Sequence, residues 1–281
     1  MSKISAHVNN IALHHSVFAL PFAYMGTFLA SGGIPSAAAV LWVTVAMVGA
    51  RSAALALDNL IDLKYDKLHP RFTKRPMVTG EVKKWEAVLL IFVSLGILLG
   101  AVLQLQPICL QLLPVAIFPF VIYPYMKRLT CLCHVVLGIA LAMAPAGGYM
   151  AVSGELSLPV VFLALGVCLW IAGFDVVYGC QDEEFDKANN LHSMATRFTA
   201  AGALKIARGM HVVSIVCFLL TGYLFHLHPV YYTGVAIAVG TLLYQHSIVS
   251  ADDFSQVTQV YFMRNGIVAI AVFIFTVWSL M

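Results

Sequence analysis

Long apolar stretches that are almost free of charge constrain the fold of this chain more than any other feature of its sequence. A helix that crosses a lipid bilayer needs about 20 predominantly apolar residues. Hydrophobic residues make up 61% of the 281, and only 10% are charged, too few to cover a water-soluble fold of this size. The sequence therefore predicts an all-α, polytopic membrane protein that forms a single domain over residues 1–281. Nine candidate transmembrane stretches lie at 11–31, 37–57, 86–106, 109–126, 131–152, 158–180, 205–225, 229–247 and 265–280.

The sequence also argues against a membrane-spanning β-barrel and against a nucleic-acid-binding protein. The apolar stretches are continuous rather than alternating, which excludes a membrane-spanning β-barrel. A net charge of +3 leaves no basic surface for phosphates, so we expect no nucleic-acid partner. The six cysteines lie in or beside apolar stretches without the spacing of metal ligands, and we interpret them as packing residues.

The basic residues predict the orientation of the helices. Apart from Arg51, every Lys and Arg precedes the first stretch or lies in or at the edge of alternate connections, and the intervening connections contain neither. The positive-inside rule then places the N-terminus and the long connections in the cytoplasm and the C-terminus outside. We expect an integral protein of a bacterial inner membrane, whose helices surround a cavity open at the cytoplasmic side.

Acidic residues gather at two of the predicted cytoplasmic helix ends. At the first, Asp58, Asp62 and Asp66 are spaced four residues apart. Four residues turn an α-helix about 40° past one full turn and advance it by roughly 6 Å, so the three carboxylates lie on one face. Arg51 lies two turns earlier on the same face.

A second acidic group follows the sixth stretch and repeats this spacing. Asp182 and Asp186 are again four residues apart, Tyr178 precedes Asp182 by four, and Asp175 lies a further turn back. The three residues of the first ladder, at positions 58, 62 and 66, correspond to Tyr178, Asp182 and Asp186, each 120 residues further on. This constant offset indicates an internal repeat.

We interpret the two ladders as a divalent-cation site. One Asp at a helix C-terminus is usually a solvated residue, but carboxylates stacked on one face repel each other. Mg²⁺ takes one or two carboxylates from a protein and completes its shell with water and substrate phosphates. Two facing ladders could therefore clamp a diphosphate through two or more Mg²⁺ ions. The candidate metal ligands are Asp58, Asp62, Asp66, Asp182 and Asp186.

Polar residues near the ladders supply candidate substrate contacts. The orientation rule alone already demands basic residues in these connections, so their presence has two explanations. Guanidinium groups also match the geometry of phosphate oxygens, which favours contact with an anionic substrate. The candidates for substrate binding in these segments are Arg71, Arg75, Lys127, Arg128, Ser193 and Arg197.

Arg51 is the basic residue that lies inside a predicted transmembrane stretch. An Arg at the centre of such a helix costs about 2.5–3.5 kcal/mol on the insertion scale, so it is a functional candidate. Two interpretations stay open at this point. Arg51 forms a salt bridge with Asp58 or with an acid of the sixth stretch, or it receives an anionic group, such as a substrate carboxylate, within the cavity.

These motifs resemble those of the UbiA superfamily of intramembrane aromatic prenyltransferases. Residues 58–66, followed by His69-Pro70-Arg71 and Arg75-Pro76, are similar to the first family motif, and residues 175–186 are similar to the second. The order, separation and nine-stretch layout also agree, so the resemblance covers nearly the whole chain. The chain departs from the family pattern at Asp58, where the family usually has Asn.

Within the superfamily, the segment 170–178 with residues 191–193 and 197–198 is similar to the 4-hydroxybenzoate polyprenyltransferase branch. The resemblance implies Mg²⁺-dependent transfer of a polyprenyl group from a polyprenyl diphosphate to an aromatic acid. The implied acceptor is 4-hydroxybenzoate or a dihydroxynaphthoate, and the implied pathway is ubiquinone or menaquinone biosynthesis.

The resemblance also implies roles for individual residues. Arg51 matches an Arg that faces the carboxylate of the aromatic acid, and Lys127 contacts the diphosphate together with the loop arginines. Asp175 hydrogen-bonds or deprotonates the phenol, which raises the nucleophilicity of the ring. Tyr178 orients the diphosphate or Asp182. Asp175, Tyr178 and Arg51 are therefore the candidate catalytic residues.

Three other functions share some of these sequence features. A cation-coupled transporter predicts acids near the bilayer midplane, whereas these lie at helix ends. A CDP-alcohol phosphotransferase also uses an Asp ladder, but in a single motif within a smaller bundle. A haem farnesyltransferase-like enzyme would need a different acceptor pocket. These alternatives stay open beside the aromatic prenyltransferase.

Overall fold

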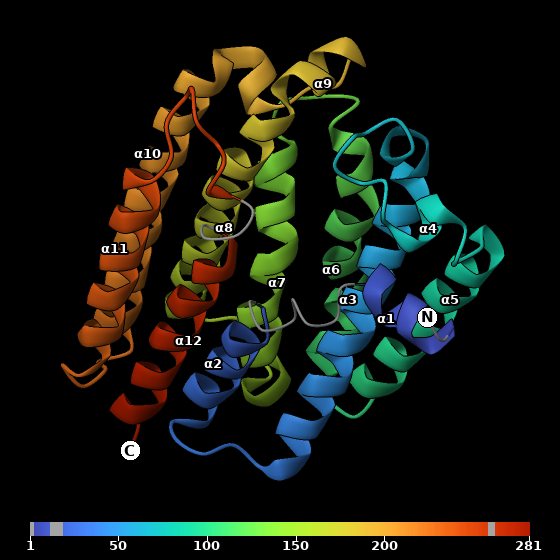
Figure 1. The fold of residues 1–281 in the computed structure, drawn as a ribbon. Helices are drawn as coiled ribbons and strands as arrows, with labels where there is room; N and C mark the ends of the chain where they lie inside the picture. Colours follow the sequence, from blue (N-terminus) through green and yellow to red (C-terminus); the bar gives the residue numbers. More distant parts are fainter. Residues whose placement is uncertain (1–2, 12–18, 258–261) are drawn as a thin grey trace.

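The computed structural model describes residues 3–11, 19–257 and 262–281, and the regular structure of these residues is helical (Figure 1). This confirms the predicted all-α class. Its elements in chain order are α1 (Lys3–Asn10), α2 (Leu20–Ser31), α3 (Ala37–Asp66), α4 (Pro76–Thr79), α5 (Lys84–Val102), α6 (Pro107–Met126), α7 (Cys133–Ser153), α8 (Leu158–Gly179), the 3₁₀ turn η2 (Cys180–Asp182), α9 (Glu183–Ala188), α10 (Met194–Leu224), α11 (Tyr231–Ser247) and α12 (Phe262–Ser279).

Within the described part of the chain, six helical stretches are long and apolar enough to cross a membrane. They are α3, α5, α6, α7, the continuous stretch Leu158–Ala188 and α10. The three remaining predicted stretches correspond to the shorter helices α2, α11 and α12, and residues 12–18 of the first stretch lie outside the described residues. The chain is an integral membrane protein.

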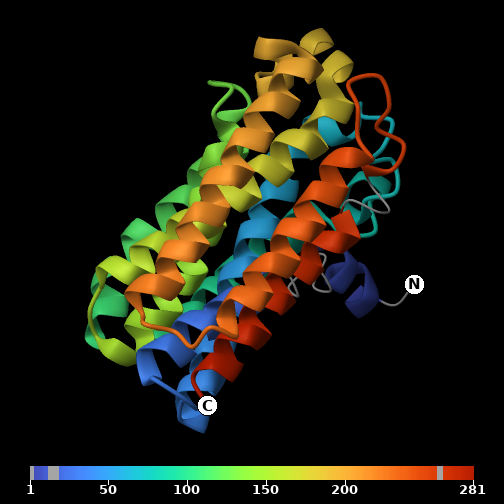
Figure 2. The same ribbon diagram turned by 90° about the vertical axis from the view of Figure 1, so that its left-hand side faces the viewer.

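The long helices run side by side, and the polar segments gather at one end of the bundle. Figures 1 and 2 place α9 and the connections after α3 and α6 at this end, with the C-terminus at the opposite end. Because the connections after α3 and α6 carry most of the basic candidates, the fold brings them to the two acidic ladders.

Glycines let α7 approach its neighbours at backbone distance. A Cβ added to Gly26 of α2 would lie 2.1 Å from the Pro145 carbonyl oxygen, and one added to Gly148 would lie 2.1 Å from that of Ala23. Small residues at helix crossings are the usual means of close packing in membranes. The helices α2 and α7 therefore pack closely together where they cross.

The first ladder lies on one continuous helix, as its spacing predicts. Ser36 caps the start of α3 by accepting a hydrogen bond from the Ala39 backbone N–H at 3.2 Å. From there α3 runs without interruption to Asp66, beyond the predicted stretch 37–57. The regular helix keeps the three carboxylates on one face.

The second ladder lies on a less regular part of its helical stretch than the first. The helix α8 ends at Gly179, Asp182 lies in the 3₁₀ turn, and Asp186 lies in the short helix α9. Glycine is about 1 kcal/mol less favourable than Ala inside a helix. Here its small size also admits the His134 ring, whose Cε1 would be 3.0 Å from a Cβ at Gly179.

The helix α10 begins eleven residues before the predicted stretch 205–225. Ser193 forms a reciprocal cap with Thr196, in which each side-chain oxygen accepts a hydrogen bond from the other residue's backbone N–H. Thr199 interrupts the helix with φ 62° and ψ 164°. The Glu183 carboxylate of α9 then accepts a hydrogen bond from the Ala200 N–H at 2.9 Å, which ties the second acidic segment to α10.

Candidate active site

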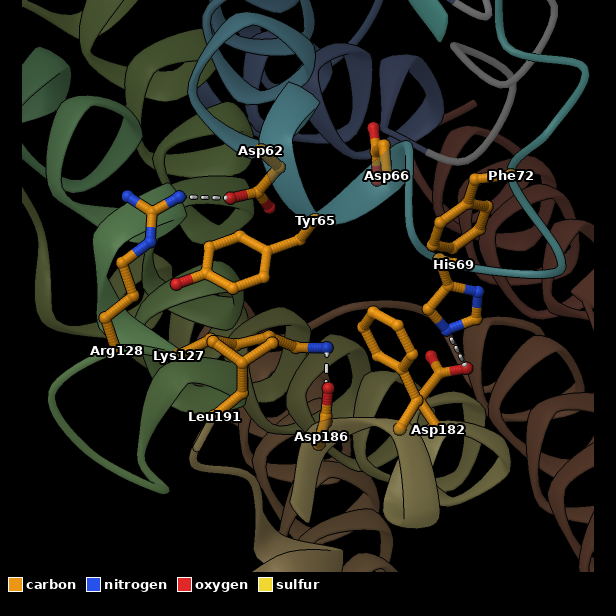
Figure 3. Close-up of a pocket in the computed structure, with 11 residues that line it drawn as sticks. Asp62, Tyr65, Asp66, His69, Phe72, Lys127, Arg128, Asp182, Asp186 and Leu191 are labelled. Carbon is orange, nitrogen blue, oxygen red and sulfur yellow. Dashed lines mark hydrogen bonds and ion pairs between the residues drawn. The ribbon is translucent and has the colours of Figure 1, made fainter. Parts of the chain in front are cut away.

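The two ladders meet at a small polar pocket of about 50 Å³ (Figure 3). Asp62 and Asp66 approach it from α3, and Asp182 and Asp186 approach it from the segment after α8. Figure 3 shows these two pairs on opposite sides of the pocket, with the Lys127 ammonium extended between them. The remaining lining residues are Tyr65, His69, Phe72, Arg128, Phe185 and Leu191.

Each of these four carboxylates contacts a cation of the chain itself. Four carboxylates therefore face four basic groups, and their formal charges cancel. Asp66, Asp182 and Asp186 are at most 5% exposed, so an unpaired charge at any of them would be costly. The pairs are Arg128 Nη2–Asp62 Oδ1 at 2.9 Å, Arg75 Nη1–Asp66 Oδ2 at 2.5 Å, Arg71 Nη1–Asp182 Oδ1 at 2.6 Å and Lys127 Nζ–Asp186 Oδ2 at 3.5 Å.

The field of the pocket also acts on Lys127. Burial opposes its charge, but the nearby carboxylates, led by Asp186 and Asp182, outweigh this effect and raise the pKa of the ammonium above its ordinary value. Lys127 therefore stays charged at physiological pH. It gives the pocket a permanent cation that lies close to the place where an anionic substrate would enter.

His69 belongs to the pocket, although the sequence assigned it no role. Its Nε2 lies 3.1 Å from Asp182 Oδ1, and its ring lies between the rings of Phe72 and Phe185, at centroid distances of 4.5 and 4.2 Å. Burial lowers the pKa of His69, and Asp182 opposes this only in part. Its position after the first ladder, in His69-Pro70-Arg71, was the signal that could have marked it.

Asp58 is the predicted metal ligand that does not reach the polar pocket. It lies one helical turn deeper in α3 and lines a second, larger cavity. Eight residues of α-helix advance about 12 Å, so a ladder of three carboxylates is longer than a pocket of this size. Its counterpart in the second group, Tyr178, lines the same cavity.

This second cavity has a volume of about 810 Å³ and is lined mainly by apolar side chains of α2, α3 and α5–α8. Arg75 lines it and also pairs with Asp66 in the polar pocket, so the two spaces are neighbours. We call this space the apolar cavity. The charged residues of its lining are Arg51, Asp58, Arg75 and Asp175.

Arg51 lines the apolar cavity without a counter-ion among the described residues. Its Nε is buried and has no hydrogen-bond partner there, and Asp58, which lines the same cavity, forms no ion pair with it. A buried donor without a partner is costly, so such a group is suited to receive an acceptor from a ligand. Among the described residues Arg51 forms no salt bridge, and its role as an anion receptor stays a prediction.

Asp175 and Tyr178 lie on the α8 side of this cavity. The Asp175 carboxylate is 2.7 Å from Nδ1 of His134, a residue that no local sequence pattern marks. The Tyr178 ring lies 4.9 Å from the Arg71 guanidinium carbon, within the range of a cation–π contact. Tyr178, which lines the apolar cavity, therefore contacts the arginine that pairs with Asp182. This contact is a second link between the apolar cavity and the polar pocket.

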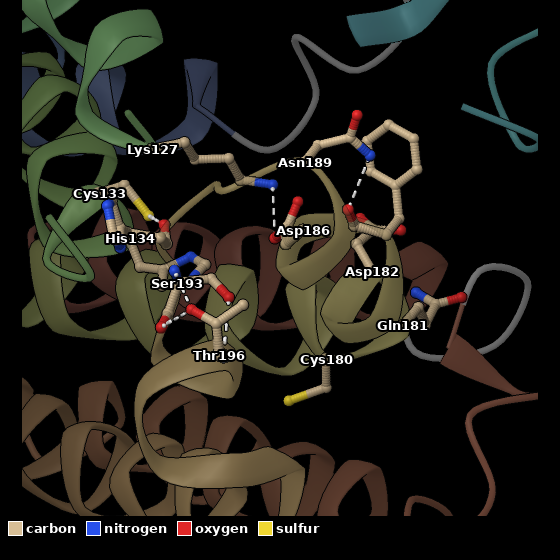
Figure 4. A network of polar contacts seen from close by, with 12 residues as sticks. Lys127, Cys133, His134, Cys180, Gln181, Asp182, Asp186, Asn189, Ser193 and Thr196 are labelled. Atoms are coloured by element: carbon tan, nitrogen blue, oxygen red, sulfur yellow. Dashed lines mark hydrogen bonds and ion pairs between the residues drawn. The ribbon is translucent and has the colours of Figure 1, made fainter. Parts of the chain in front are cut away.

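Two predicted substrate-binding residues are not brought to either space. Ser193 is fully buried and uses its hydroxyl in the cap of α10, as Figure 4 shows. Arg197 is exposed one turn further along α10. Neither lines the polar pocket or the apolar cavity. The cap of α10 gives Ser193 a structural role, and substrate binding by Ser193 and Arg197 stays a prediction.

The donor set of the polar pocket fits a hard divalent cation. Aspartate oxygens are the ligands that Mg²⁺ prefers. Among the described residues, buried Asp186 Oδ2 has no hydrogen bond, and its ion-pair partner Lys127 lies 3.5 Å away. Among the described residues, however, no three Asp, Glu, His or Cys side chains converge closely enough to hold a metal as they stand. To bind a metal ion, the carboxylates would have to give up some of their contacts with Arg and Lys.

Residues 19–267 match the UbiA prenyltransferase family. The 4-hydroxybenzoate octaprenyltransferase of Haemophilus ducreyi is 33% identical over 235 residues, which are 84% of this chain and 82% of that protein. The enzyme of the same name from Tolumonas auensis is 30% identical over 222 residues, or 79% of this chain and 77% of that protein. The similarity therefore includes both ladders and the helices between them.

Solved structures extend this similarity to the fold. The chain is similar to a UbiA homologue from Aeropyrum pernix with a TM-score of 0.86 and 29% identity, over 95% of this chain and 98% of that one. A UbiA homologue from Archaeoglobus fulgidus, solved with GPP and Mg²⁺, has a TM-score of 0.78 and 17% identity, over 98% of this chain and 99% of that one. At that identity the second likeness concerns the fold alone.

Proposed function

The chain belongs to the UbiA prenyltransferase family, and from this premise we propose that it transfers a polyprenyl group from a polyprenyl diphosphate to the ring of an aromatic acid. The acceptor is 4-hydroxybenzoate or a related hydroxylated acid such as a dihydroxynaphthoate, and the product enters quinone biosynthesis. One observation carries the proposal. The four-carboxylate, four-cation pocket adjoins an apolar cavity that contains Arg51, a buried arginine that has no counter-ion among the described residues.

The polar pocket supplies the binding site for the diphosphate. Asp62, Asp66, Asp182 and Asp186 would hold Mg²⁺, which when bound neutralises diphosphate charge and so assists its departure. Relatives of the same fold, solved with prenyl diphosphates and Mg²⁺, support this assignment. Asp58 is the weakest of the predicted ligands because it lines the apolar cavity instead.

The cations of the pocket bind the same diphosphate. When a carboxylate turns to the metal, its arginine or lysine partner becomes available for phosphate oxygens. Guanidinium forks suit those oxygens, and Lys127 adds a point charge. Arg71, Arg75, Lys127 and Arg128 therefore act as counter-ions of the ladders before the substrate binds and as substrate ligands afterwards.

The apolar cavity orients the acceptor and excludes water. Arg51 binds the acid group, and Asp175 accepts a hydrogen bond from the ring hydroxyl, which raises the electron density of the ring. The apolar lining holds the prenyl chain and keeps water from the allylic carbon as its bond to the diphosphate oxygen breaks. A ring carbon then forms the new bond to that allylic carbon, and the ring loses a proton.

The membrane setting follows from the same proposal. Polyprenyl diphosphates partition into lipid, so an enzyme that uses them gains from a cavity within the bilayer. We propose the nine-span layout with the polar pocket at the cytoplasmic face, the N-terminus inside and the C-terminus outside, in a bacterial inner membrane. The basic connections that support this orientation lie at the end of the bundle that carries the pocket (Figure 1).

An assay of the purified protein in detergent or liposomes tests the proposed function. The reaction contains Mg²⁺, an allylic polyprenyl diphosphate and one radiolabelled acid from a panel: 4-hydroxybenzoate, 1,4-dihydroxy-2-naphthoate or 1,4-dihydroxy-6-naphthoate. We expect a lipid-soluble labelled product that disappears with EDTA, and the preferred acid identifies the acceptor. Protein that binds Mg²⁺ and diphosphate but yields no product with any of the acids would contradict the proposal.

A further inference from the structure

We propose that His134 is a positioning residue for this reaction, which fixes the Asp175 carboxylate so that one of its oxygens faces the acceptor. The inference rests on the proposed function, because it concerns how that function recognises the ring hydroxyl of its acceptor. It is drawn from the contacts of His134 at the start of α7 and not from either carboxylate ladder.

The pair joins a buried residue to one that faces the apolar cavity. His134 Nδ1 lies 2.7 Å from Asp175 Oδ2. The His134 side chain is 1% exposed, whereas that of Asp175 is 19% exposed and lines the cavity. The histidine is therefore out of reach of the substrate, and its effect on the reaction passes through Asp175.

A backbone contact decides which ring nitrogen carries the proton. The Met194 N–H, at the first residue of α10, lies 3.4 Å from His134 Nε2. A backbone N–H can only donate, so in the neutral ring this contact makes Nε2 the acceptor. In the neutral ring the proton then lies on Nδ1, which donates it to Asp175.

The packing around the ring preserves this arrangement. Figure 4 shows His134 between the start of α7 and the cap of α10, beside Cys133 and Ser193. On its other side Gly179 leaves the space that the ring occupies, since a Cβ there would lie 3.0 Å from His134 Cε1. Gly179 is therefore both the last residue of α8 before the second ladder and the residue that leaves space for the His134 ring.

The consequence for catalysis concerns the orientation of one carboxylate. The contact between His134 Nδ1 and Oδ2 holds the Asp175 carboxylate in one direction and leaves Oδ1 for a hydrogen bond from the acceptor. A carboxylate oxygen accepts hydrogen bonds, so Asp175 selects a ring with a free hydroxyl. Arg51 selects the acid group of the same molecule. Together they define the acceptor as a hydroxyaryl carboxylate.

Two substitutions of His134 separate positioning from packing. His134→Asn places its amide nitrogen where Nδ1 lies and keeps the donor to Asp175, whereas His134→Leu removes the donor. For His134→Leu we expect kcat/KM for the acceptor to fall roughly 10- to 100-fold, as for the loss of a hydrogen bond to a charged group. The KM for the prenyl diphosphate should stay unchanged, and His134→Asn should recover most of the activity.

A matched control uses another deeply buried histidine. His211 is 3% exposed and contacts His246 and the Trp170 carbonyl, but does not line the apolar cavity. We expect His211→Leu to alter thermal stability without a selective loss at the acceptor. In an Asp175→Asn background, His134→Leu should bring no further loss, because the group on which it acts is already changed.

Several outcomes would overturn the inference. One is a folded His134→Leu protein with wild-type kcat/KM for the acceptor. Another is an equal loss in His134→Asn and His134→Leu, or a full additional loss in the Asp175→Asn background. If His134→Leu does not fold, His134→Met replaces it, since its flexible side chain fills irregular space without a donor. A wild-type protein that transfers nothing contradicts the proposed function, and wild-type activity with an insensitive His134 contradicts only this inference.

Discussion

In the polar pocket each of the four ladder carboxylates contacts a cation of the chain, whereas in the apolar cavity Arg51 has a buried Nε without a partner among the described residues. Both spaces are built against α3, and Arg75 belongs to both. Under the proposed function, this difference follows from the ligands of the two spaces. Diphosphate and metal would arrive with opposite charges and exchange partners with a balanced set of ion pairs, whereas an acid in an apolar space would need a free cation.

The comparison predicts two distinct kinds of kinetic defect. Changes in the polar pocket should affect the diphosphate, the metal and the rate of transfer, whatever acceptor is supplied. Changes in the apolar cavity should affect one acceptor relative to another. The following substitutions and treatments test this division, in order of expected effect.

The largest effect is expected for Asp62→Ala and Asp182→Ala, one from each side of the polar pocket. Each removes a carboxylate assigned to Mg²⁺ and leaves an arginine without its partner. We expect transfer to fall about 100- to 1,000-fold, as when one preorganised electrostatic group is removed from an active site. Rates at saturating acceptor and a range of Mg²⁺ concentrations measure this. Activity retained in folded Asp62→Ala would refute the metal assignment.

The second effect is expected for Arg51→Met, which keeps an unbranched, flexible side chain but removes the charge. The KM for the aromatic acid should rise about 10- to 100-fold, in line with a lost hydrogen bond to a charged group. The KM for the prenyl diphosphate should not change. An acceptor phenol that lacks the acid group serves as the control, because it should lose nothing. Equal losses for both acceptors would show that Arg51 supports the fold instead.

Residues outside both spaces should change stability and leave both kinetic constants unchanged. Ser193→Ala removes the cap of α10 and should cost about 1 kcal/mol of unfolding free energy. Arg197→Ala alters an exposed side chain and should stay within about 0.5 kcal/mol. Thermal melts and steady-state kinetics of the two variants test these values. A raised KM for either substrate would restore the substrate-binding role that the sequence suggested.

The smallest effect is expected for removal of the metal from the protein without substrate. A site that held Mg²⁺ at 100 times its Kd would lose about 2.7 kcal/mol on chelation. Because the ladder carboxylates already contact cations, we expect EDTA to lower stability by less than about 1 kcal/mol. Mg²⁺ and a diphosphate analogue together should stabilise more than the sum of each alone. A large loss with EDTA alone would contradict this description of the pocket.

The sequence predicts those parts of the site that local periodicity controls. Asp58, Asp62 and Asp66 lie on one helix because a spacing of four residues is a helical property. The ladder's counter-ions are set by tertiary structure: Arg128 lies 66 residues from Asp62, and Arg71 lies 111 residues from Asp182. Patterns along the chain do not reveal such partners.

Other differences between the sequence predictions and the structure arise where one residue type is compatible with two roles. Ser193 stands before an apolar run, a pattern that is typical of a helix cap as well as of a polar contact. Gly179 could have signalled the break of α8, because glycine is a poor residue for a helix interior. His134 had no signal of its own, since its role depends on Asp175, which lies 41 residues away.

The ion pairs of the ladders have a consequence for the supply of this protein in a cell. A chain whose proposed metal-binding carboxylates carry their own counter-ions would complete the assembly of its helices before any metal arrives. Scarcity of magnesium would then reduce the output of each molecule and leave the number of molecules in the membrane unchanged. The pool of enzyme would be ready to resume work when the metal returns, without new synthesis.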